Sequence, residues 1–282
     1  MSLTVGHLIS QAQKLQLRTE MEIYMAHLMK VGRLDLLAHP DSVVPIELLA
    51  QLQSGLVELM KGRPVHFLTN EKEFYGMPFF VDERVLIPRG CTELLVDEIL
   101  KVANQGANIL EIGVGSGAIS IALQKTRPDL KILATDISAE ALAVASQNAK
   151  VQEVEIEFFQ SDLLEAVPAR HFDVLVANLP YIGEEKHRYV TEEVEKYEPH
   201  LALFGGSDGL RLYERLFQEI VEQKRKFQVI CGEIGFSQGP ELEAMAKRFF
   251  PNLVFELRQD LEGLDRHFFL TSDKITLEKT SS

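Results

Sequence analysis

From residue 108 onward, short apolar segments alternate with amphipathic ones, and this alternation restricts the possible folds more than any other feature of the chain. Strand-like segments occupy 108–113, 131–136, 155–160, 172–178 and 227–235, with two more near 253–260 and 265–272. Helical patterns fall between them at 117–126, 138–150, 208–225 and 237–249. Such alternation predicts a mostly parallel sheet covered by helices on both faces, with the last two strands paired as an antiparallel edge.

The residues before this alternation predict a smaller helical region. Apolar residues recur at spacings of three and four over 2–16, 20–33 and 45–64, which indicates helices. Residues 65–87 are instead rich in aromatic and β-branched residues, with Gly76 and Pro78 as a turn, and predict a β-hairpin. We therefore expect a helical bundle at 1–64, a linker hairpin at 65–87 and a larger α/β domain at 88–282, whose first helix has Thr92 as its N-cap.

The composition predicts a cytoplasmic protein rather than a secreted or membrane protein. No window approaches the roughly 18 consecutive apolar residues that a membrane span needs, and the N-terminus lacks the pattern of a signal peptide. The two cysteines, Cys91 and Cys231, lie far apart, and the eight histidines have no ligand spacing, so we expect no disulfide and no metal site. The net charge is −13, which disfavours binding to duplex DNA.

A glycine-rich loop follows the first strand of the predicted sheet. The segment ILEIGVGSGAIS places Gly113, Gly115 and Gly117 between that strand and the next helix. Glycine is needed where the backbone takes a positive φ or approaches a ligand closely, and loops at this edge of a sheet border the ligand crevice. The spacing G-x-G-x-G differs from the G-x-G-x-x-G pattern of dinucleotide sites.

Acidic side chains follow the neighbouring strands. Asp136 ends the second strand, where a carboxylate can accept hydrogen bonds from both ribose hydroxyls of a nucleoside. Glu111 precedes the glycine loop and points to the same crevice, where it can bind the loop backbone or an ammonium group. Asp162 is placed either to meet an adenine amino group or simply to form a turn, and Leu163 can cover an adenine face. Together with the loop, these residues favour S-adenosylmethionine over a dinucleotide.

The fourth strand ends in a segment suited to holding a planar amide. Residues 176–183 read VANLPYIG, so that Asn178, Leu179, Pro180 and Tyr181 follow the strand directly. A planar nitrogen nucleophile needs acceptors for both of its N–H groups and an in-line approach to the methyl carbon. The Asn178 side-chain oxygen and the Leu179 carbonyl are such acceptors, and the Tyr181 ring can stack on the planar group. The alternative is that these residues only end a strand and form a turn.

Several segments together make the chain similar to a known family. It resembles the HemK (PrmC) family, the N5-glutamine methyltransferases that modify peptide chain release factors. The resemblance covers nearly the whole chain and rests on FYGMPFFVDERVLIPR, TELLVDE, EIGVGSGAI, ATDIS, SDLL, NLPYI, YEPHLALFGGSDGL, GEIGFSQG and DLEGLDR. It implies a mostly parallel, seven-stranded Rossmann-like methyltransferase sheet, and an N-terminal helical domain that docks the release factor.

The resemblance also assigns roles to residues. It implies that S-adenosylmethionine, which leaves as S-adenosylhomocysteine, contacts Gly113, Val114, Gly115, Ser116, Gly117, Asp136, Leu163 and Asn178. The glutamine of a Gly-Gly-Gln loop would be held by Asn178, Leu179, Pro180 and Tyr181, of which Asn178, Pro180 and Tyr181 are the catalytic residues. Arg89 is a further candidate for the peptide or a carboxylate, although it can equally form a surface ion pair.

The chain departs from the family pattern at two places. Leu179 replaces the first proline of Asn-Pro-Pro-Tyr, which keeps the backbone carbonyl but removes the φ restraint of proline. Residues 88–93 read PRGCTE where the family has Pro-Arg-Pro-Glu-Thr-Glu. The alternatives that remain are a glutamine methyltransferase of a ribosomal protein, an N6-adenine methyltransferase of nucleic acid, and a scaffold without activity.

Overall fold

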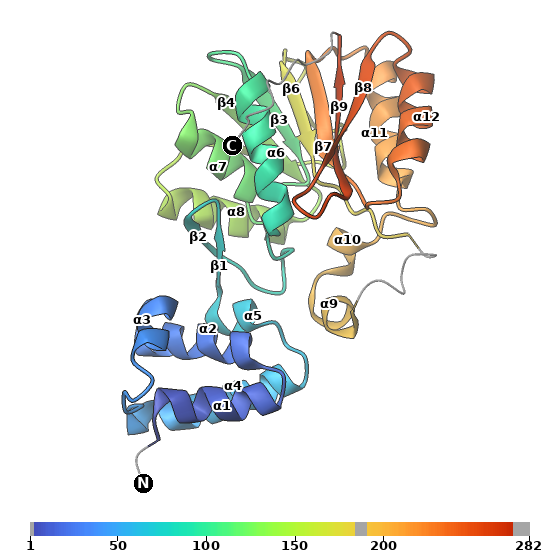
Figure 1. The fold of residues 1–282 in the computed structure, drawn as a ribbon. Helices are drawn as coiled ribbons and strands as arrows, with labels where there is room; N and C mark the ends of the chain where they lie inside the picture. Colours follow the sequence, from blue (N-terminus) through green and yellow to red (C-terminus); the bar gives the residue numbers. More distant parts are fainter. Residues whose placement is uncertain (1–2, 184–190, 273–282) are drawn as a thin grey trace. The chain divides into compact units, whose positions relative to one another are not determined.

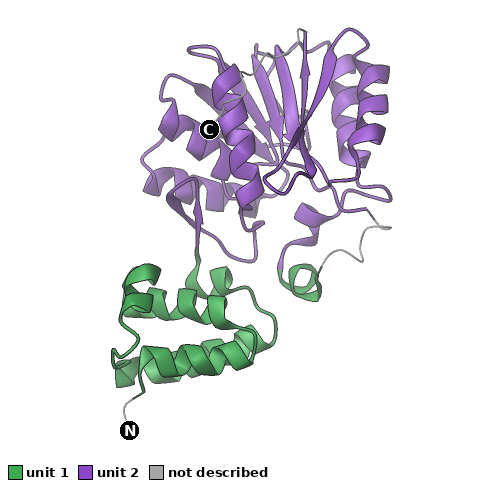
Figure 2. Cartoon of the chain, viewed as in Figure 1, with its two compact units in different colours: residues 1–71, 191–197 green, residues 72–190, 198–282 purple. Residues whose placement is uncertain are grey.

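The structure is a computed structural model that describes residues 3–183 and 191–272. The chain divides into two compact units (Figure 2). The smaller unit comprises Met1–Glu71 with Thr191–Tyr197, and the larger comprises Lys72–Val190 with Glu198–Ser282. The domain boundaries predicted from the sequence assign all of residues 88–282 to one domain, whereas the structure assigns residues 191–197 to the smaller unit.

The smaller unit is helical. Its helices are α1 (Val5–Lys14), α2 (Arg18–Met29), α3 (Arg33–Ala38), α4 (Ile46–Met60), α5 (Val65–Thr69) and α9 (Glu192–Tyr197). The apolar spacing works as expected, because it places Val5, Ile9 and Ala12 on the buried face of α1. The Thr4 hydroxyl caps this helix by accepting a hydrogen bond from the backbone N–H of His7 at 3.3 Å. The α9 helix belongs here through the Tyr197 hydroxyl, which donates to the Lys61 carbonyl at 3.2 Å.

A short hairpin follows α5. Its strands, β1 (Glu71–Phe74) and β2 (Met77–Phe80), are joined through Tyr75 and Gly76, both of which have positive φ. The hairpin is therefore shorter than the predicted 65–87, and Val65–Thr69 is a helix, not a strand. Pro64 precedes this helix with its φ fixed at −56°, and Asn70 ends it in the left-handed conformation.

The larger unit is built on a seven-stranded sheet (Figure 1). The strands are β3 (Asn108–Ile112), β4 (Lys131–Asp136), β5 (Glu157–Gln160), β6 (Val174–Ala177), β7 (Val229–Glu233), β8 (Val254–Gln259) and β9 (Asp265–Thr271), in the order β5-β4-β3-β6-β7-β9-β8. The first five are parallel, and β9 is antiparallel to both β7 and β8. The predicted fold class, a mostly parallel seven-stranded methyltransferase sheet with an antiparallel edge, is confirmed.

Helices cover both faces of this sheet, as Figure 1 shows. They are α6 (Gly90–Val102), α7 (Ala118–Thr126), α8 (Ala139–Val151), α11 (Arg211–Glu222) and α12 (Gly239–Phe249), and the short helix α10 (His200–Leu203) lies beyond the ends of the strands. Alternate residues of each strand feed two different cores: Ile109 and Val174 pack with α6 and α7, whereas Leu110 and Leu175 pack with α11 and α12. Because successive side chains of a strand point to opposite faces, continuous apolar strands are what a doubly covered sheet requires.

Two details of the larger unit bear on the expectations. Helix α6 begins at Gly90 with Arg89 at the N-cap, so Thr92 is not the N-cap but the third residue of the helix. Ser138 is the N-cap of α8, because its hydroxyl accepts a hydrogen bond from the Ala141 backbone N–H at the start of that helix. Across residues 3–183 and 191–272, no helix has both the length and the apolar character needed to cross a membrane.

Candidate active site

Four neighbouring strands end in one row at the carboxyl edge of the sheet. The register pairs Ile112 of β3 with Thr135 of β4 and with Ala177 of β6, and Ala177 in turn with Gly232 of β7. The residues that come next on these strands are therefore neighbours in space: Gly113, Asp136, Asn178 and Glu233. This row lies where the chain order changes direction in the sheet, which is the usual place for a ligand in an open α/β fold.

A cavity of about 570 Å³ borders this row within the larger unit. Asp136 and Asn178 both contribute to its wall, so the two side chains on which the predicted site depends do share one cavity. Other predicted site residues that line it are Arg89, Gly113, Val114, Gly115, Ser116, Leu163, Leu179 and Pro180. The volume is within the range of roughly 300–1,000 Å³ typical of small-molecule sites.

The glycine loop takes the conformation that glycine allows. Gly113, Gly115 and Gly117 have φ values of +78°, +53° and +85°. A Cβ at Gly115 would meet no atom within 4 Å, so the backbone is open at that point. Gly117 is not among the described residues that line the cavity; a Cβ there would come within 2.8 Å of the Ile121 side chain, so this glycine lets the first turn of α7 pack.

Asp136 joins the glycine loop to the cavity. One of its carboxylate oxygens accepts from the Gly115 backbone N–H at 2.9 Å and the other from the Ser138 N–H at 2.9 Å. A carboxylate oxygen can accept more than one hydrogen bond, so both remain able to accept from a ligand. Burial raises the pKa of Asp136, and the backbone N–H groups oppose that rise.

Glu111 is buried beside the same loop. Its carboxyl group accepts hydrogen bonds from the backbone N–H and the hydroxyl of Ser120, on the first turn of α7. Burial raises the pKa of Glu111 to about 8, although the bonds from Ser120 act to lower it. The expected contact with the loop is therefore made to the start of the following helix, while the side chain still reaches the cavity wall.

The segment after β6 divides between the cavity and the protein interior. Asn178, Leu179 and Pro180 line the cavity, and the Leu179 side chain lies against Gly113, where a Cβ would be 3.4 Å away. Tyr181 is not among the described residues that line the cavity; its hydroxyl donates to Glu233 at 3.0 Å, and its carbonyl accepts from Gln238 at 2.9 Å. The stacking role of the Tyr181 ring therefore stays a prediction.

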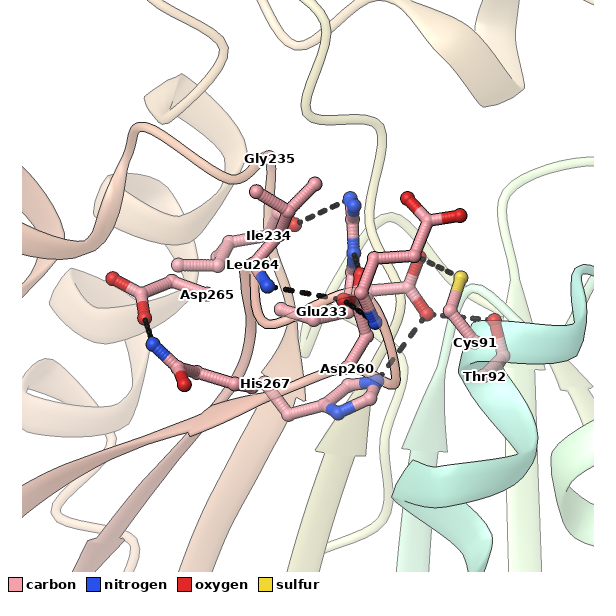
Figure 3. A network of polar contacts seen from close by, with 12 residues as sticks. Cys91, Thr92, Glu233, Ile234, Gly235, Asp260, Leu264, Asp265 and His267 are labelled. Carbon is pink, nitrogen blue, oxygen red and sulfur yellow. Dashed lines mark hydrogen bonds and ion pairs between the residues drawn. The ribbon is translucent and has the colours of Figure 1, made fainter.

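A buried carboxylate connects several of these side chains. Glu233, at the end of β7, accepts hydrogen bonds from the Thr92 hydroxyl at 2.6 Å and from the Asn178 amide nitrogen at 3.3 Å, and its other oxygen accepts from Tyr181. Figure 3 shows Cys91, Thr92 and His267 around this carboxylate, with His267 Nε2 at 3.7 Å. Burial acts to raise the pKa of Glu233, but the nearby His267 imidazole and the hydrogen bonds from Thr92 and Tyr181 hold it below its ordinary value.

Arg89 is bound to a buried acid at the cavity wall. Its guanidinium donates to Glu198 at 2.5 Å, and the other oxygen of Glu198 accepts from the Ile87 backbone N–H at 3.2 Å. Glu198 is only 3% exposed, so this pair is partly desolvated rather than a loose surface contact. The arginine holds the start of the Pro199–Ala202 stretch, which forms another part of the wall.

The last predicted contacts follow β5. Leu163 is buried, has a φ of +48° and lines the cavity, as does Asp162. The Asp162 carboxylate accepts from Arg215 at 3.0 Å, which is a structural contact in addition to the turn or ligand role considered from the sequence.

Comparison with known proteins places this site in a family. The methyltransferase small domain matches residues 89–204, and the PrmC N-terminal domain matches residues 7–69. The chain is 37% identical over 231 residues to the release factor glutamine methyltransferase of Enterococcus faecalis, covering 82% of this chain and 83% of that one. It is 34% identical over 255 residues to that of Bacillus anthracis, covering 88% and 90%.

The chain belongs to the family of release factor glutamine methyltransferases. The resemblance found in the sequence is thereby confirmed, and so is the prediction of an S-adenosylmethionine-dependent methyltransferase. Among solved structures, the N-terminal domain of human METTL16 in complex with SAH is 15% identical with a TM-score of 0.50, covering 71% of this chain and 77% of that one. At that identity the likeness concerns the fold alone.

The residues of the cavity fit S-adenosylmethionine, the methyl donor of this family. The open backbone at Gly115 leaves room that any other residue would fill with its Cβ, and Asp136 offers acceptors beside it. The lining is mainly apolar with a few polar groups, which suits a nucleoside with one charged end. Family membership therefore agrees with the chemistry of the wall.

The sequence did not predict the residues that hold the cavity-lining side chains in place. Glu233 and Glu198 occur only within the longer segments quoted for the family resemblance, and His267 is not a predicted site residue. Glu233 carries a usable signal, because a carboxylate that directly follows the apolar residues of a parallel strand must lie at the ligand edge. Glu198 has no such signal, since its partner Arg89 is 109 positions away in the sequence.

Proposed function

We propose that this chain transfers a methyl group from S-adenosylmethionine to the side-chain amide nitrogen (N5) of a glutamine, the glutamine of the Gly-Gly-Gln loop of a peptide chain release factor. The observation that carries this proposal is the position of Asn178, whose side chain lines the same cavity as Asp136 and follows the strand beside the glycine loop. The names of the curated relatives support the release factor as the acceptor.

In this proposal the end of β6 holds and aims the acceptor amide. The Asn178 side-chain oxygen and the Leu179 carbonyl accept the two N–H groups of the glutamine amide, and Pro180 fixes the turn behind them. With both N–H groups held, the nitrogen lone pair is directed along one line, which an in-line displacement requires. S-adenosylmethionine supplies the methyl group and leaves as S-adenosylhomocysteine.

No general base is part of the proposed reaction. The amide nitrogen becomes strongly acidic once it is methylated, so its proton is lost to water. The neighbouring Cys91 and Tyr181 are not suited to the role of a base, because burial raises the pKa of Cys91 to about 11 and that of Tyr181 well above its ordinary value. Positioning is therefore the main contribution of the protein.

The rest of the chain has supporting roles in this proposal. The helical unit docks the release factor, and Arg89, although paired with Glu198, still lines the cavity and contacts the incoming peptide. The proposed place of the reaction is the cytoplasm, where translation terminates.

Transfer of isotope from labelled S-adenosylmethionine tests the proposal. We expect label on a purified release factor, loss of label when the glutamine of its Gly-Gly-Gln loop is changed to alanine, and loss of most of the rate in Asn178→Ala. Label on a ribosomal protein or on adenine in DNA or RNA instead would replace this function with one of the alternatives. No label on any of these acceptors would leave a scaffold without activity.

A further inference from the structure

The carboxylate of Glu233 has no part in the reaction as proposed above, yet it is buried at the edge of the sheet where the cavity lies. It is 1% exposed, and hydrogen bonds from Thr92, Asn178 and Tyr181 converge on it from three separate segments (Figure 3 shows the surroundings). Burying a charge is costly unless it is paired and hydrogen-bonded. A neutral residue would avoid that cost, so the charge itself calls for an explanation.

Resting on the proposed function, we infer that Glu233 is a positioning residue: it fixes the Asn178 side chain so that the amide oxygen, and not the amide nitrogen, faces the acceptor glutamine.

The orientation follows from the chemistry of the neighbours. Among the described residues, the Asn178 amide nitrogen donates to the Glu233 carboxylate at 3.3 Å and to the Thr92 hydroxyl oxygen at 3.5 Å. The Thr92 hydroxyl already donates its proton to Glu233, so toward Asn178 it can only accept. A flipped amide would set its oxygen against a carboxylate and a hydroxyl oxygen, with no donor to pair with. Only one orientation is compatible with these partners.

The orientation decides what the cavity can bind. The nitrogen of a glutamine amide carries two N–H donors, so it must be met by an acceptor. With Nδ2 held by Glu233, Asn178 presents Oδ1, which is such an acceptor. The negative charge behind the amide also polarises it and strengthens Oδ1 as an acceptor, as expected for linked hydrogen bonds in a buried site.

The same carboxylate restrains the residue that follows Pro180 in the acceptor segment. Its second oxygen accepts from the Tyr181 hydroxyl at 3.0 Å, while the Tyr181 carbonyl is held by Gln238. Residues 178 and 181 are thus tied to one group, on the neighbouring strand. These two hydrogen bonds to Glu233 restrain the segment by a route other than the backbone restraint that a proline at position 179 would supply.

The test compares the wild type with Glu233→Gln, which keeps the size of the side chain and removes the charge. With one acceptor oxygen in place of two, the glutamine cannot accept from Tyr181 and from the Thr92 and Asn178 pair at once, so the restraint on the Asn178 amide is weakened. We expect kcat for release-factor methylation to fall by about 100-fold, comparable to losing one preorganised hydrogen bond in an active site. The dissociation constant of S-adenosylmethionine and the thermal midpoint should stay near those of the wild type, which a merely structural role would not allow.

Two further measurements separate positioning from general damage. In an Asn178→Ala background, Glu233→Gln should cause no additional loss of kcat, because the effect passes through Asn178. With 15N-labelled asparagine, of which the chain has six, the side-chain amide signal of Asn178 should shift in Glu233→Gln while those of the others stay in place. Additive losses in the double variant, or an unmoved Asn178 signal, would overturn the inference.

If Glu233→Gln does not fold, Thr92→Val gives the same information. It removes the hydroxyl that meets both Glu233 and Asn178, and should lower kcat by about tenfold, or 1.4 kcal/mol, without weakening the binding of S-adenosylmethionine. An unchanged kcat would count against the inference. Failure of the wild type to label a release factor would instead refute the proposed function, so the two failures are distinguishable.

Discussion

At the scale of single residues, the Asp136 carboxylate joins the glycine loop to the cavity. It accepts hydrogen bonds from the backbone of Gly115 and Ser138, and it lines the cavity beside them. The same carboxylate therefore holds the glycine loop in place, and in the proposed function it also offers acceptors to a bound nucleoside.

Replacing Asp136 by asparagine should weaken both tasks. An amide has one acceptor oxygen instead of two, so one of the two backbone N–H groups would face an NH2 group. We expect the dissociation constant of S-adenosylmethionine to rise by about tenfold to 100-fold, which corresponds to about 1–3 kcal/mol for lost hydrogen bonds, with a lower thermal midpoint. Isothermal calorimetry checks the binding, and an unchanged dissociation constant would remove Asp136 from the proposed nucleoside site.

Glu111 makes a prediction about pH. Because burial raises its pKa to about 8 from an ordinary value of 4.5, the folded state holds a proton that the unfolded state has released over that interval. The resulting stabilisation is fully present below about pH 4.5 and is lost as the pH rises through about 8. The slope is at most about 1.4 kcal/mol per pH unit.

Glu111→Gln removes this proton equilibrium. Urea unfolding at pH 5, 6.5 and 8 should show the free energy of unfolding of the wild type declining relative to the variant as the pH increases. A constant difference between the two proteins at all three values would mean that Glu111 is ionised in the folded state.

At the scale of elements, the ends of β6 and β7 must approach closely to bring Asn178 next to Glu233. The buried Tyr213 hydroxyl lies 2.9 Å from the Ala177 carbonyl and 2.7 Å from the Glu233 carbonyl, so it joins the two ends. Gly232 makes this possible, since a Cβ there would be 2.3 Å from the Ala177 carbonyl oxygen.

Gly232→Ala should therefore separate the two strand ends. The clash is with backbone, which cannot rotate away, so we expect a loss of about 1–3 kcal/mol in the free energy of unfolding and a larger proportional loss of kcat. Gly90→Ala is the matched control, because a Cβ at Gly90 would meet no atom within 4 Å. Equal behaviour of the two variants would show that the strand ends adjust freely.

The sheet was predictable because its elements are long and strongly patterned. The central strands β3, β4, β6 and β7 are mainly apolar and buried, and each helix that covers the sheet is at least nine residues long. The short helices α5, α9 and α10 have only four to six residues, too few to establish a period of 3.6. The residue type of Thr92 predicts an N-cap, but in the structure its hydroxyl donates a hydrogen bond to Glu233 instead.

The site was predictable only where each residue follows a strand. Asp136 and Asn178 could be assigned to one edge of the sheet because parallel strands all end there. The surroundings of Glu233 are different: Thr92, Tyr181 and His267 come from segments that no sequence spacing connects. Such networks depend on tertiary packing, which a single sequence does not reveal.

At the scale of the whole molecule, the chain passes from the smaller unit to the larger one, returns to the smaller unit for a short segment and then continues in the larger unit. Residues 191–197 belong to the smaller unit (Figure 2). In the sequence they lie between two parts of the larger unit: the acceptor segment, which is followed by Gly183, and Glu198, which binds Arg89. The smaller unit also has its own core, centred on Met25 of α2. Its integrity can therefore be changed without touching a residue of the cavity.

Gly55→Ala provides that change and the last prediction. A Cβ at Gly55 of α4 would be 2.0 Å from the Tyr24 ring of α2, and a buried ring cannot move aside easily. We expect the smaller unit to lose about 1–3 kcal/mol of stability. If it docks the release factor, KM for the release factor should rise while the dissociation constant of S-adenosylmethionine stays the same.

Gly32→Ala, in the same unit, is the control, because a Cβ at Gly32 would meet no atom within 4 Å. Its KM should match that of the wild type. Stability is followed by thermal unfolding, KM by isotope transfer, and binding by calorimetry. A rise in KM for Gly55→Ala together with weaker S-adenosylmethionine binding would mean that the disturbance reaches the larger unit. A destabilised variant with unchanged KM would contradict the docking role, because a unit that holds the acceptor must keep its packing to do so.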